Sequence, residues 1–268
     1  MSRQPVEGLL TLRRLGRSLA LLVCKQNRRR RDIIGRNHSD ASDVLRGPLW
    51  FLPFGWVTVA NEPTAPTIAN LHDQLAPYAL WIDGVGGYLA CLSHRVTLGQ
   101  SQVESPVDIA LIADVSRHHA TIQRDTEGYF LEAVRKVQIN GQAIEKALLR
   151  SSDRITLGSS CQLQFWQPVA VSTSARLDMV SGHRFAEPVQ AVLLMADTLV
   201  IGPAQQSHIQ VPEMTQPLIL FRTKSGLAAR WPGSLVISGK TYQERGPLDA
   251  GATLATEQIT LALERMRI

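Results

Sequence analysis

The stretch Leu111-Ile112-Ala113-Asp114-Val115-Ser116-Arg117-His118-His119-Ala120-Thr121-Ile122 decides how this sequence is interpreted. Its two ends are apolar, and together with their neighbours they predict short strands at Asp108–Ile112 and Ala120–Arg124. The polar residues between these strands predict a loop. A loop that a rigid β scaffold holds in place is a common position for binding residues.

Short apolar runs separated by turn residues continue on both sides of this stretch. The further strands that we expect are Ala79–Ile82, Tyr88–Leu92, Val96–Leu98, Tyr129–Glu132, Val137–Ile139, Gln142–Ile144, Arg154–Leu157 and Gln162–Trp166. Asn140-Gly141 is the strongest hairpin signal, because both residues of a tight two-residue turn need positive φ. About ten short strands in some 90 residues predict an all-β sandwich.

The glycines of Asp83-Gly84-Val85-Gly86-Gly87 do not predict a nucleotide-binding loop. A phosphate-binding glycine loop opens a helix and presents the N-terminus of that helix to the anion. Here the glycines lie between two expected strands, and no Lys-Ser/Thr pair follows them. They indicate a tight reversal between strands instead.

The order of these pieces closely resembles the forkhead-associated (FHA) domain over about 79–166. The family pattern runs Gly-Arg, Ser-Arg-x-His-Ala, Asn-Gly and then Leu-x-x-Gly-Asp-x-Ile-x-x-Gly. The matching residues are Gly99-Gln100, Ser116-Arg117-His118-His119-Ala120, Asn140-Gly141 and Leu149 followed by Asp153-Arg154-Ile155-Thr156-Leu157-Gly158. The resemblance implies a non-enzymatic interaction module that recognises phosphothreonine in a partner protein through loops at one end of the sandwich.

The resemblance assigns roles to individual residues of the loop. Ser116 would donate its hydroxyl to a phosphate oxygen, and Arg117 could supply charge and a forked donor. His119 would lie inside the loop and hold its shape. Gly99 and the Asn140-Gly141 hairpin would be structural.

Two departures from the family pattern affect the expected phosphate site. The principal phosphate-binding arginine of the family is Gln100 here, which can donate a hydrogen bond but carries no charge. The family's Ser-x-Asn-Gly-Thr loop, whose Asn grips the peptide backbone, looks deleted, because Ala133 leads directly through Val134-Arg135-Lys136 to Val137. In one interpretation Arg135 and Lys136, on this shortened loop, restore the positive charge. In the other, phosphate recognition is lost and the sandwich is a phospho-independent scaffold or assembly component.

Weak matches recur in the same order at a nearly constant offset of about 100 residues. The matched pairs are Leu98-Gly99 with Ile201-Gly202, Asp108-Ile109 with His208-Ile209, Glu127–Tyr129 with Ser225–Leu227, Ile139–Gln142 with Ile237–Lys240 and Leu149 with Leu248. We therefore expect a second, degenerate FHA-like sandwich over 185–268. Met214–Leu218 replaces the Ser-Arg-x-His segment there, so a ligand site is expected on the first copy only.

Charge is distributed unevenly along the 268 residues. Residues 1–50 hold 11 Lys+Arg and 4 Asp+Glu, a surplus of +7 that leaves 17 against 19 in the rest of the chain. The run Arg28–Arg31 could contact nucleic acid or an anionic membrane, or it could be a solvated tail. Residues 1–76 show little periodicity, and we expect this basic, Pro- and aromatic-rich segment to be partly disordered.

The composition gives no support for a metal centre, a cofactor or catalysis. Cys24, Cys91 and Cys161 are scattered, which argues against a disulfide framework or a zinc site and fits a reducing cytosol. The adjacent residues His118 and His119 would point to opposite faces of a strand and could not chelate easily. Ser116 and His119 share a loop, but nothing marks an oxyanion hole or a nucleophile elbow.

These observations predict two FHA-like β-sandwiches in tandem, over 77–168 and 185–268, after a basic N-terminal segment over 1–76. Residues 169–184 would form a linker with a helical or turn segment. We expect a cytoplasmic protein-interaction module without a small-molecule substrate.

Overall fold

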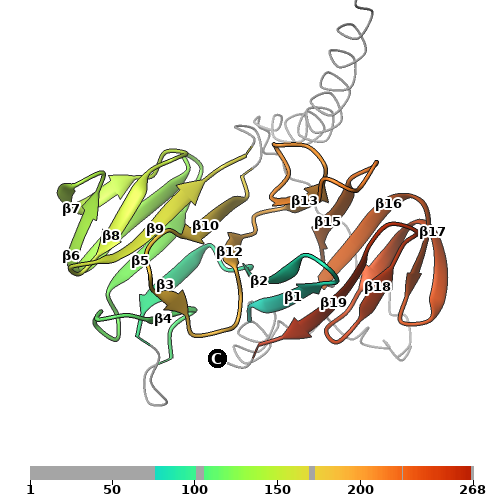
Figure 1. Cartoon of the computed structure of the whole chain (residues 1–268), viewed down its shortest axis with the longest axis horizontal. Coiled ribbons are helices and arrows are strands. Elements are labelled where there is room, and N and C mark those ends of the chain that lie inside the picture. Colours follow the sequence, from blue (N-terminus) through green and yellow to red (C-terminus); the bar gives the residue numbers. More distant parts are fainter. Residues whose placement is uncertain (1–75, 101–105, 169–172, 225, 267–268) are drawn as a thin grey trace, which may run out of the picture. The chain divides into compact units, whose positions relative to one another are not determined.

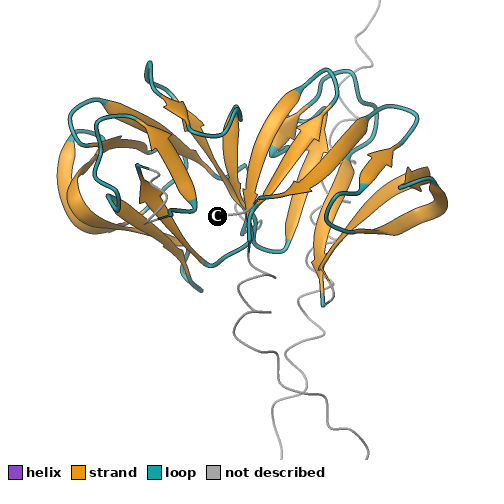
Figure 2. Ribbon diagram, turned by 90° about the horizontal axis from the view of Figure 1, so that it is seen from below, coloured by secondary structure: helices purple, strands orange, loops and turns teal. Residues whose placement is uncertain are grey.

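The computed structural model describes residues 76–100, 106–168, 173–224 and 226–266 (Figure 1). The expected N-terminal segment, with Arg28–Arg31, lies outside these residues apart from Ala76. The described residues contain strands and loops but no helix, which confirms the all-β prediction (Figure 2). None of them therefore belongs to a helix that could cross a membrane.

Nineteen strands make up the described part of the chain. The first nine are β1 (Tyr78–Ile82), β2 (Gly86–Cys91), β3 (Arg95–Gly99), β4 (Ile109–Ile112), β5 (Ala120–Arg124), β6 (Tyr129–Ile139), β7 (Gln142–Leu148), β8 (Arg154–Leu157) and β9 (Cys161–Trp166). The others are β10 (Ala175–Met179), β11 (Arg184–Phe185), β12 (Ala191–Leu194), β13 (Thr198–Gly202), β14 (Ile209–Gln210), β15 (Leu218–Thr223), β16 (Gly226–Ile237), β17 (Lys240–Leu248), β18 (Thr253–Ala255) and β19 (Thr260–Arg265).

Strands β3 to β9 pair mostly with their neighbours in sequence. β3 pairs with β4 in parallel and with β5 antiparallel, and antiparallel pairs β5–β6, β6–β7, β6–β8 and β8–β9 follow. Alternate residues of β4, β8 and β9 point into one core, as the period-2 pattern requires. In β9, for example, Cys161, Leu163 and Phe165 are buried while the residues between them are not.

The structure differs from the sequence interpretation within β6. The two expected strands Tyr129–Glu132 and Val137–Ile139 are one strand, and Ala133–Lys136 forms a bulge in it rather than a shortened loop. Paired backbone groups explain the difference: Val134 N and Arg135 N both donate to the His119 carbonyl, at 3.0 Å each. A bulge inserts extra residues without ending the strand.

The expected helical or turn segment before residue 184 is wrong, because that region contains strand β10. β10 pairs with β9 on one side and with β12 on the other, both antiparallel. Its side chains alternate, with Ala175 and Leu177 buried, so β10 belongs to the sheet. The next short strand, β11, pairs with the end of β4 through Arg184 opposite Ile112 and Phe185 opposite Leu111.

Strands β13 to β19 form a second set of pairings around a second core. β13 pairs with β14 in parallel and with β15 antiparallel, and β15–β16, β16–β17, β16–β18 and β18–β19 follow antiparallel. β1 pairs with β19 and with β2, although β1 begins the described chain and β19 ends it (Figure 1). β2 and β12 pair in parallel between the two cores.

Candidate functional site

The polar loop of Ser116–His119 is held against the end of β3 by backbone contacts. Gln100 N donates to Ser116 O at 3.1 Å, and His119 N donates to Leu98 O at 2.9 Å. A Cβ atom on Gly99 would lie only 1.9 Å from Arg117 O. Position 99 therefore has no room for a side chain. Close packing against the loop explains why the residue before Gln100 is a glycine.

The buried side chain of His119 connects three segments at this end of the first core. Its Nδ1 accepts a hydrogen bond from Ser116 N at 3.1 Å, and its Nε2 lies 2.9 Å from Lys136 O. The Nε2 atom also lies 3.0 Å from Gly158 N. The imidazole thus fixes the loop relative to the β6 bulge and lies in contact with the turn after β8.

These contacts determine which ring nitrogen of His119 carries the proton. Nδ1 can accept from Ser116 N only when it is unprotonated, so the neutral ring carries its proton on Nε2 and donates to Lys136 O. Gly158 N also donates to Lys136 O, at 3.0 Å, so two donors converge on one carbonyl. A carbonyl oxygen has two lone pairs and can accept both bonds.

The residues expected to bind phosphate lie on the segments that hold this buried histidine and its loop. Ser116 is half-buried, and Gln100, Arg117, Arg135 and Lys136 are exposed. The contacts above bring the backbones of all five residues to the end of the sandwich where His119 lies. Within the described part of the chain, no hydrogen bond or ion pair occupies their side chains, so their donors are available to a ligand.

The Asn140-Gly141 hairpin has positive φ at both residues, 52° and 84°, as a tight two-residue turn requires. The Asn140 side chain does not reach the Ser116 loop. It donates to Asp153 Oδ1 at 2.8 Å and accepts from Arg154 N at 2.9 Å. These bonds join the hairpin to the start of β8.

Sequence reasoning missed Arg184, an exposed cation next to the candidate site. Arg184 lies opposite Ile112 in the β11–β4 pair, where β4 leads into the Ser116 loop. A shallow depression of about 400 Å³ is lined there by Gln100, Leu111, Ile112, Ala113 and Ala186, so the β11 segment and Gln100 share one surface. No sequence signal links Arg184 to the loop, because pairing partners of short strands are not encoded in hydrophobic periodicity.

The two adjacent histidines do not form a metal site in the described part of the chain. The His118 side chain lies on the surface with its Nε2 2.9 Å from the Thr121 hydroxyl, while His119 is buried. No group of three His, Cys, Asp or Glu side chains is placed to hold a metal ion within the described ranges. The thiols of Cys91 and Cys161 are buried, and burial raises the pKa of Cys161 to about 11.

The corresponding end of the second core lacks such a cluster. Gly202 packs against Pro217, whose Cα would lie 3.1 Å from an added Cβ, and Met214 is buried. Trp231, next to the β16 bulge, is fully buried and belongs to the second core. Apolar groups therefore stand where the first half has Ser116 and His119.

Residues 96–158 match the family model of the FHA domain, a range that contains the Ser116 loop, the β6 bulge and the Asn140-Gly141 hairpin but not Arg184. No curated protein matches the chain. Among solved structures, the FHA-2 domain of a Mycobacterium tuberculosis ABC transporter shares 18% identity and covers 51% of this chain and 99% of that domain, with a TM-score of 0.27.

Two further solved structures resemble the chain over a shorter range. Mycobacterium tuberculosis EmbR, solved with a low-affinity phosphopeptide, is 24% identical over 37% of this chain and 28% of its own, with a TM-score of 0.26. An FHA domain described for phosphothreonine-dependent interactions is 22% identical over 31% of this chain and 88% of its own, with a TM-score of 0.24.

Proposed function

The chain carries an FHA domain at residues 96–158, and from this we propose that it is a non-enzymatic, cytoplasmic interaction module that binds threonine-phosphorylated protein partners. The binding surface is the end of the first sandwich formed by Gln100, Ser116, Arg117, Arg135 and Lys136. The observation that carries the proposal is the fixed loop: buried His119 immobilises it, while the polar side chains around it have no hydrogen bond or ion pair with the residues that the structure describes.

The charge of the surface suits a phosphate group. A phosphothreonine side chain carries about −1.5 to −2 charges at pH 7 and three acceptor oxygens. Arg117, Arg135 and Lys136 supply cations from two adjacent segments, and Arg184 supplies another from β11. Asp114 is the one acid of the 113–119 loop, so the cations outnumber it.

Each residue of the surface has a distinct physical role in this proposal. The Ser116 hydroxyl donates to a phosphate oxygen, and Arg117 adds a charged, forked donor. Gln100 donates a neutral hydrogen bond in place of the family arginine. His119 remains a positioning residue, because its two ring nitrogens are both occupied by backbone groups.

A second candidate function is phospho-independent docking. It is favoured by the neutral Gln100 and by the continuous β6, which leaves a bulge where the family has a peptide-gripping Asn loop. A scaffold or assembly component would use the same surface or the second half without needing a phosphate. The two candidates differ in whether binding depends on the phosphoryl group.

A phosphothreonine peptide library and its unphosphorylated twin distinguish the candidates when the full chain is the bait. We expect selective retention of phosphorylated peptides, and a loss of about tenfold or more in affinity for Ser116→Ala and for Arg117→Ala. Arg154→Ala, an exposed arginine beside the Asn140 hairpin, is the matched control and should leave affinity unchanged. Equal retention of both libraries would support the scaffold instead.

A further inference from the structure

The two sets of strands repeat one pairing scheme in the same register. Leu98 pairs with Ile109 in the β3–β4 pair, and Ile201 pairs with Ile209 in the β13–β14 pair. Arg124 pairs with Tyr129, and 98 residues later Arg222 pairs with Leu227. The hairpins after β6 and β16 also correspond, because Ser238 and Gly239 have φ of 48° and 79°.

One polar contact is repeated with different chemistry. Asp108 Oδ2 accepts from Thr97 N at 2.7 Å in the first half, and His208 Nδ1 accepts from Val200 N at 3.1 Å in the second. In both halves the side chain before the short strand β4 or β14 satisfies the backbone N–H in the third residue of β3 or β13. The sequence match of Asp108 with His208 therefore reflects a shared structural role.

The last strand of each set, β9 or β19, pairs with a strand that precedes the other set in the sequence. β10 and β12, which precede β13, extend the first set: Leu177 pairs with Phe165 of β9 and with Val192. β1 and β2, which precede β3, extend the second: Leu80 pairs with Leu263 of β19 and with Tyr88. Leu177 in the first set and Leu80 in the second therefore occupy equivalent positions in the two sheets.

The side chains of these strand pairs divide between the two cores. In β2, Leu89 and Cys91 face the first core while Tyr88 and Ala90 face the second. In β12, Val192 and Leu194 face the first core while Ala191 and Leu193 face the second. The parallel β2–β12 pair is therefore a wall shared by both cores.

We infer that the chain consists of two copies of one sandwich that have exchanged their first strand pairs within a single molecule. The first copy consists of β3–β9 closed by β10–β12, and the second consists of β13–β19 closed by β1–β2. The exchange concerns the fold and stands whether or not the Ser116 loop binds phosphothreonine. It also makes β11, with Arg184, a part of the first copy.

The connections and contacts at the wall fit this exchange. Only residues 92–94 join β2 to β3, and only 195–197 join β12 to β13; short hinge connections of this kind favour the exchange of elements. The buried Tyr129 of β6 directs its hydroxyl to Thr173 O and Leu194 O, at 2.5 and 3.0 Å, at the ends of β10 and β12.

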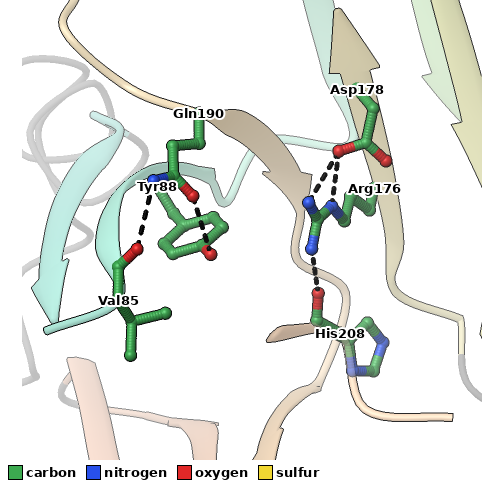
Figure 3. A network of polar contacts seen from close by, with 6 residues as sticks. All are labelled: Val85, Tyr88, Arg176, Asp178, Gln190 and His208. Carbon is green, nitrogen blue, oxygen red and sulfur yellow. Dashed lines mark hydrogen bonds and ion pairs between the residues drawn. The ribbon is translucent and has the colours of Figure 1, made fainter. Parts of the chain in front are cut away.

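A polar network links the exchanged pairs to each other and to the second set (Figure 3). Arg176 of β10 forms an ion pair with Asp178 at 2.7 Å, donates to His208 O at 3.0 Å and lies over the Tyr88 ring at 5.6 Å. Gln190 accepts from the Tyr88 hydroxyl at 3.2 Å and donates to Val85 O at 3.1 Å. The contacts of Tyr88 with Arg176 and of Gln190 with Tyr88 and Val85 join segments about 90 to 105 residues apart, whereas Arg176 and His208 are 32 residues apart.

Disulfide trapping in the full chain tests the exchange directly. Residues directly opposite in antiparallel strands have Cα atoms about 4.5 or 5.5 Å apart, within the range of a disulfide. Trp81 lies opposite Ala262, and Asp178 lies opposite Gln164. Without the exchange, Trp81 would lie opposite Gln164 and Asp178 opposite Ala262, because the two registers are equivalent.

Four double variants are compared in a background in which Cys24, Cys91 and Cys161 are replaced by Ser or Ala. We expect Trp81→Cys/Ala262→Cys and Asp178→Cys/Gln164→Cys to form intramolecular disulfides, read by mass spectrometry of unreduced digests. We expect Trp81→Cys/Gln164→Cys and Asp178→Cys/Ala262→Cys to remain as thiols.

The reverse pattern of disulfides would overturn the exchange. Covalent dimers in the first two variants would overturn an exchange within one molecule. The Asp178→Cys/Gln164→Cys and Asp178→Cys/Ala262→Cys variants decide the question even where loss of Trp81 impairs folding. No peptide ligand is needed, so failure of the proposed function would leave this result unchanged.

Discussion

At the scale of single residues, the first half depends on a histidine that is too buried to contact a ligand. His119 is 3% exposed and uses both ring nitrogens to hold the backbone of the Ser116 loop and the β6 bulge. The sequence placed this residue inside the loop through a family resemblance, but it could not identify its partners. Lys136 O and Gly158 N come from segments 17 and 39 residues away, and only the folded chain brings them to the ring.

His119→Ala should destabilise the fold and weaken peptide binding together. Removing the ring leaves Ser116 N without its acceptor and Lys136 O with Gly158 N as its one donor, and an unsatisfied buried group costs about 1–3 kcal/mol. His118→Ala is the matched control, because among the described residues the exposed His118 has only the Thr121 hydroxyl as its partner. Thermal denaturation and peptide titration of both variants check the prediction, which fails if His118→Ala costs as much as His119→Ala.

Gln100→Arg should strengthen binding of a selected phosphothreonine peptide by about tenfold or more, since a hydrogen bond to a charged group contributes about 1.5–3 kcal/mol. Gln100 is exposed beside Ser116, so an arginine has room there. Gln138→Arg adds the same charge near the Asn140 hairpin and should have little effect. Titration calorimetry at two salt concentrations is the measurement. An unchanged affinity in Gln100→Arg would show that position 100 does not face the phosphate.

The buried His208 should make the fold sensitive to acid. Burial lowers the pKa of His208 to about 4 from an ordinary 6.5, against the opposite effect of a hydrogen bond with the Ser174 backbone. The unfolded chain therefore takes up the proton first, and stability is lost as the pH falls from about 6.5 towards 4. The full loss is on the order of 3 kcal/mol, at 1.36 kcal/mol per pKa unit.

His208→Asn should flatten this pH dependence, because an Asn oxygen can accept from Val200 N without titrating near neutral pH. Urea denaturation of the wild type and the variant at pH 7 and pH 4.5 gives the four free energies of unfolding that are needed. An equal loss on acidification in both proteins would assign the acid sensitivity to other groups.

At the scale of elements, the period-2 pattern predicted most strands of the first half but not the course of β6. Two expected strands and a loop are one strand with a bulge, because the His119 carbonyl pairs with Val134 N and Arg135 N. A local sequence window cannot contain that information. The same limit explains why β10 was expected as a turn or helix: its place depends on pairing with β9 and β12.

Gly99→Ala tests whether the end of β3 fixes the loop. The added Cβ would lie 1.9 Å from Arg117 O, a backbone atom that can move only with the loop, so we expect a cost of about 1–3 kcal/mol and weaker peptide binding. Gly182→Ala is the control, because no atom of the described residues lies within 4 Å of its added Cβ. Equal stability of the two variants would show that the loop yields without cost.

At the scale of the whole molecule, the collinear matches at an offset of about 100 residues predicted two similar halves. They could not indicate which strand pair closes which half, since an apolar alternating strand fits either edge equally well. β2 and β12 illustrate the point: both of their faces are buried, so both read as continuous apolar runs. Only the pairing of β1 with β19 and of β10 with β9 reveals the arrangement.

The shared β2–β12 wall should make the described part of the chain unfold in one step. Leu157 lies in the first core and Leu254 in the second, and both are fully buried. Leu157→Ala and Leu254→Ala should each cost about 2–5 kcal/mol and lower the temperature of one common transition. Calorimetry would contradict this if it resolved two transitions, with each variant shifting only one.

Hydrogen–deuterium exchange of the full chain, with and without a library-selected phosphothreonine peptide, tests the central claim most directly. We predict slower exchange at 113–119 and 133–136 with the phosphopeptide, no such change with its unphosphorylated twin, and no protection at 203–217 of the second half. Protection that is independent of the phosphate, or that falls on the second half, would contradict phosphothreonine recognition by the Ser116 loop.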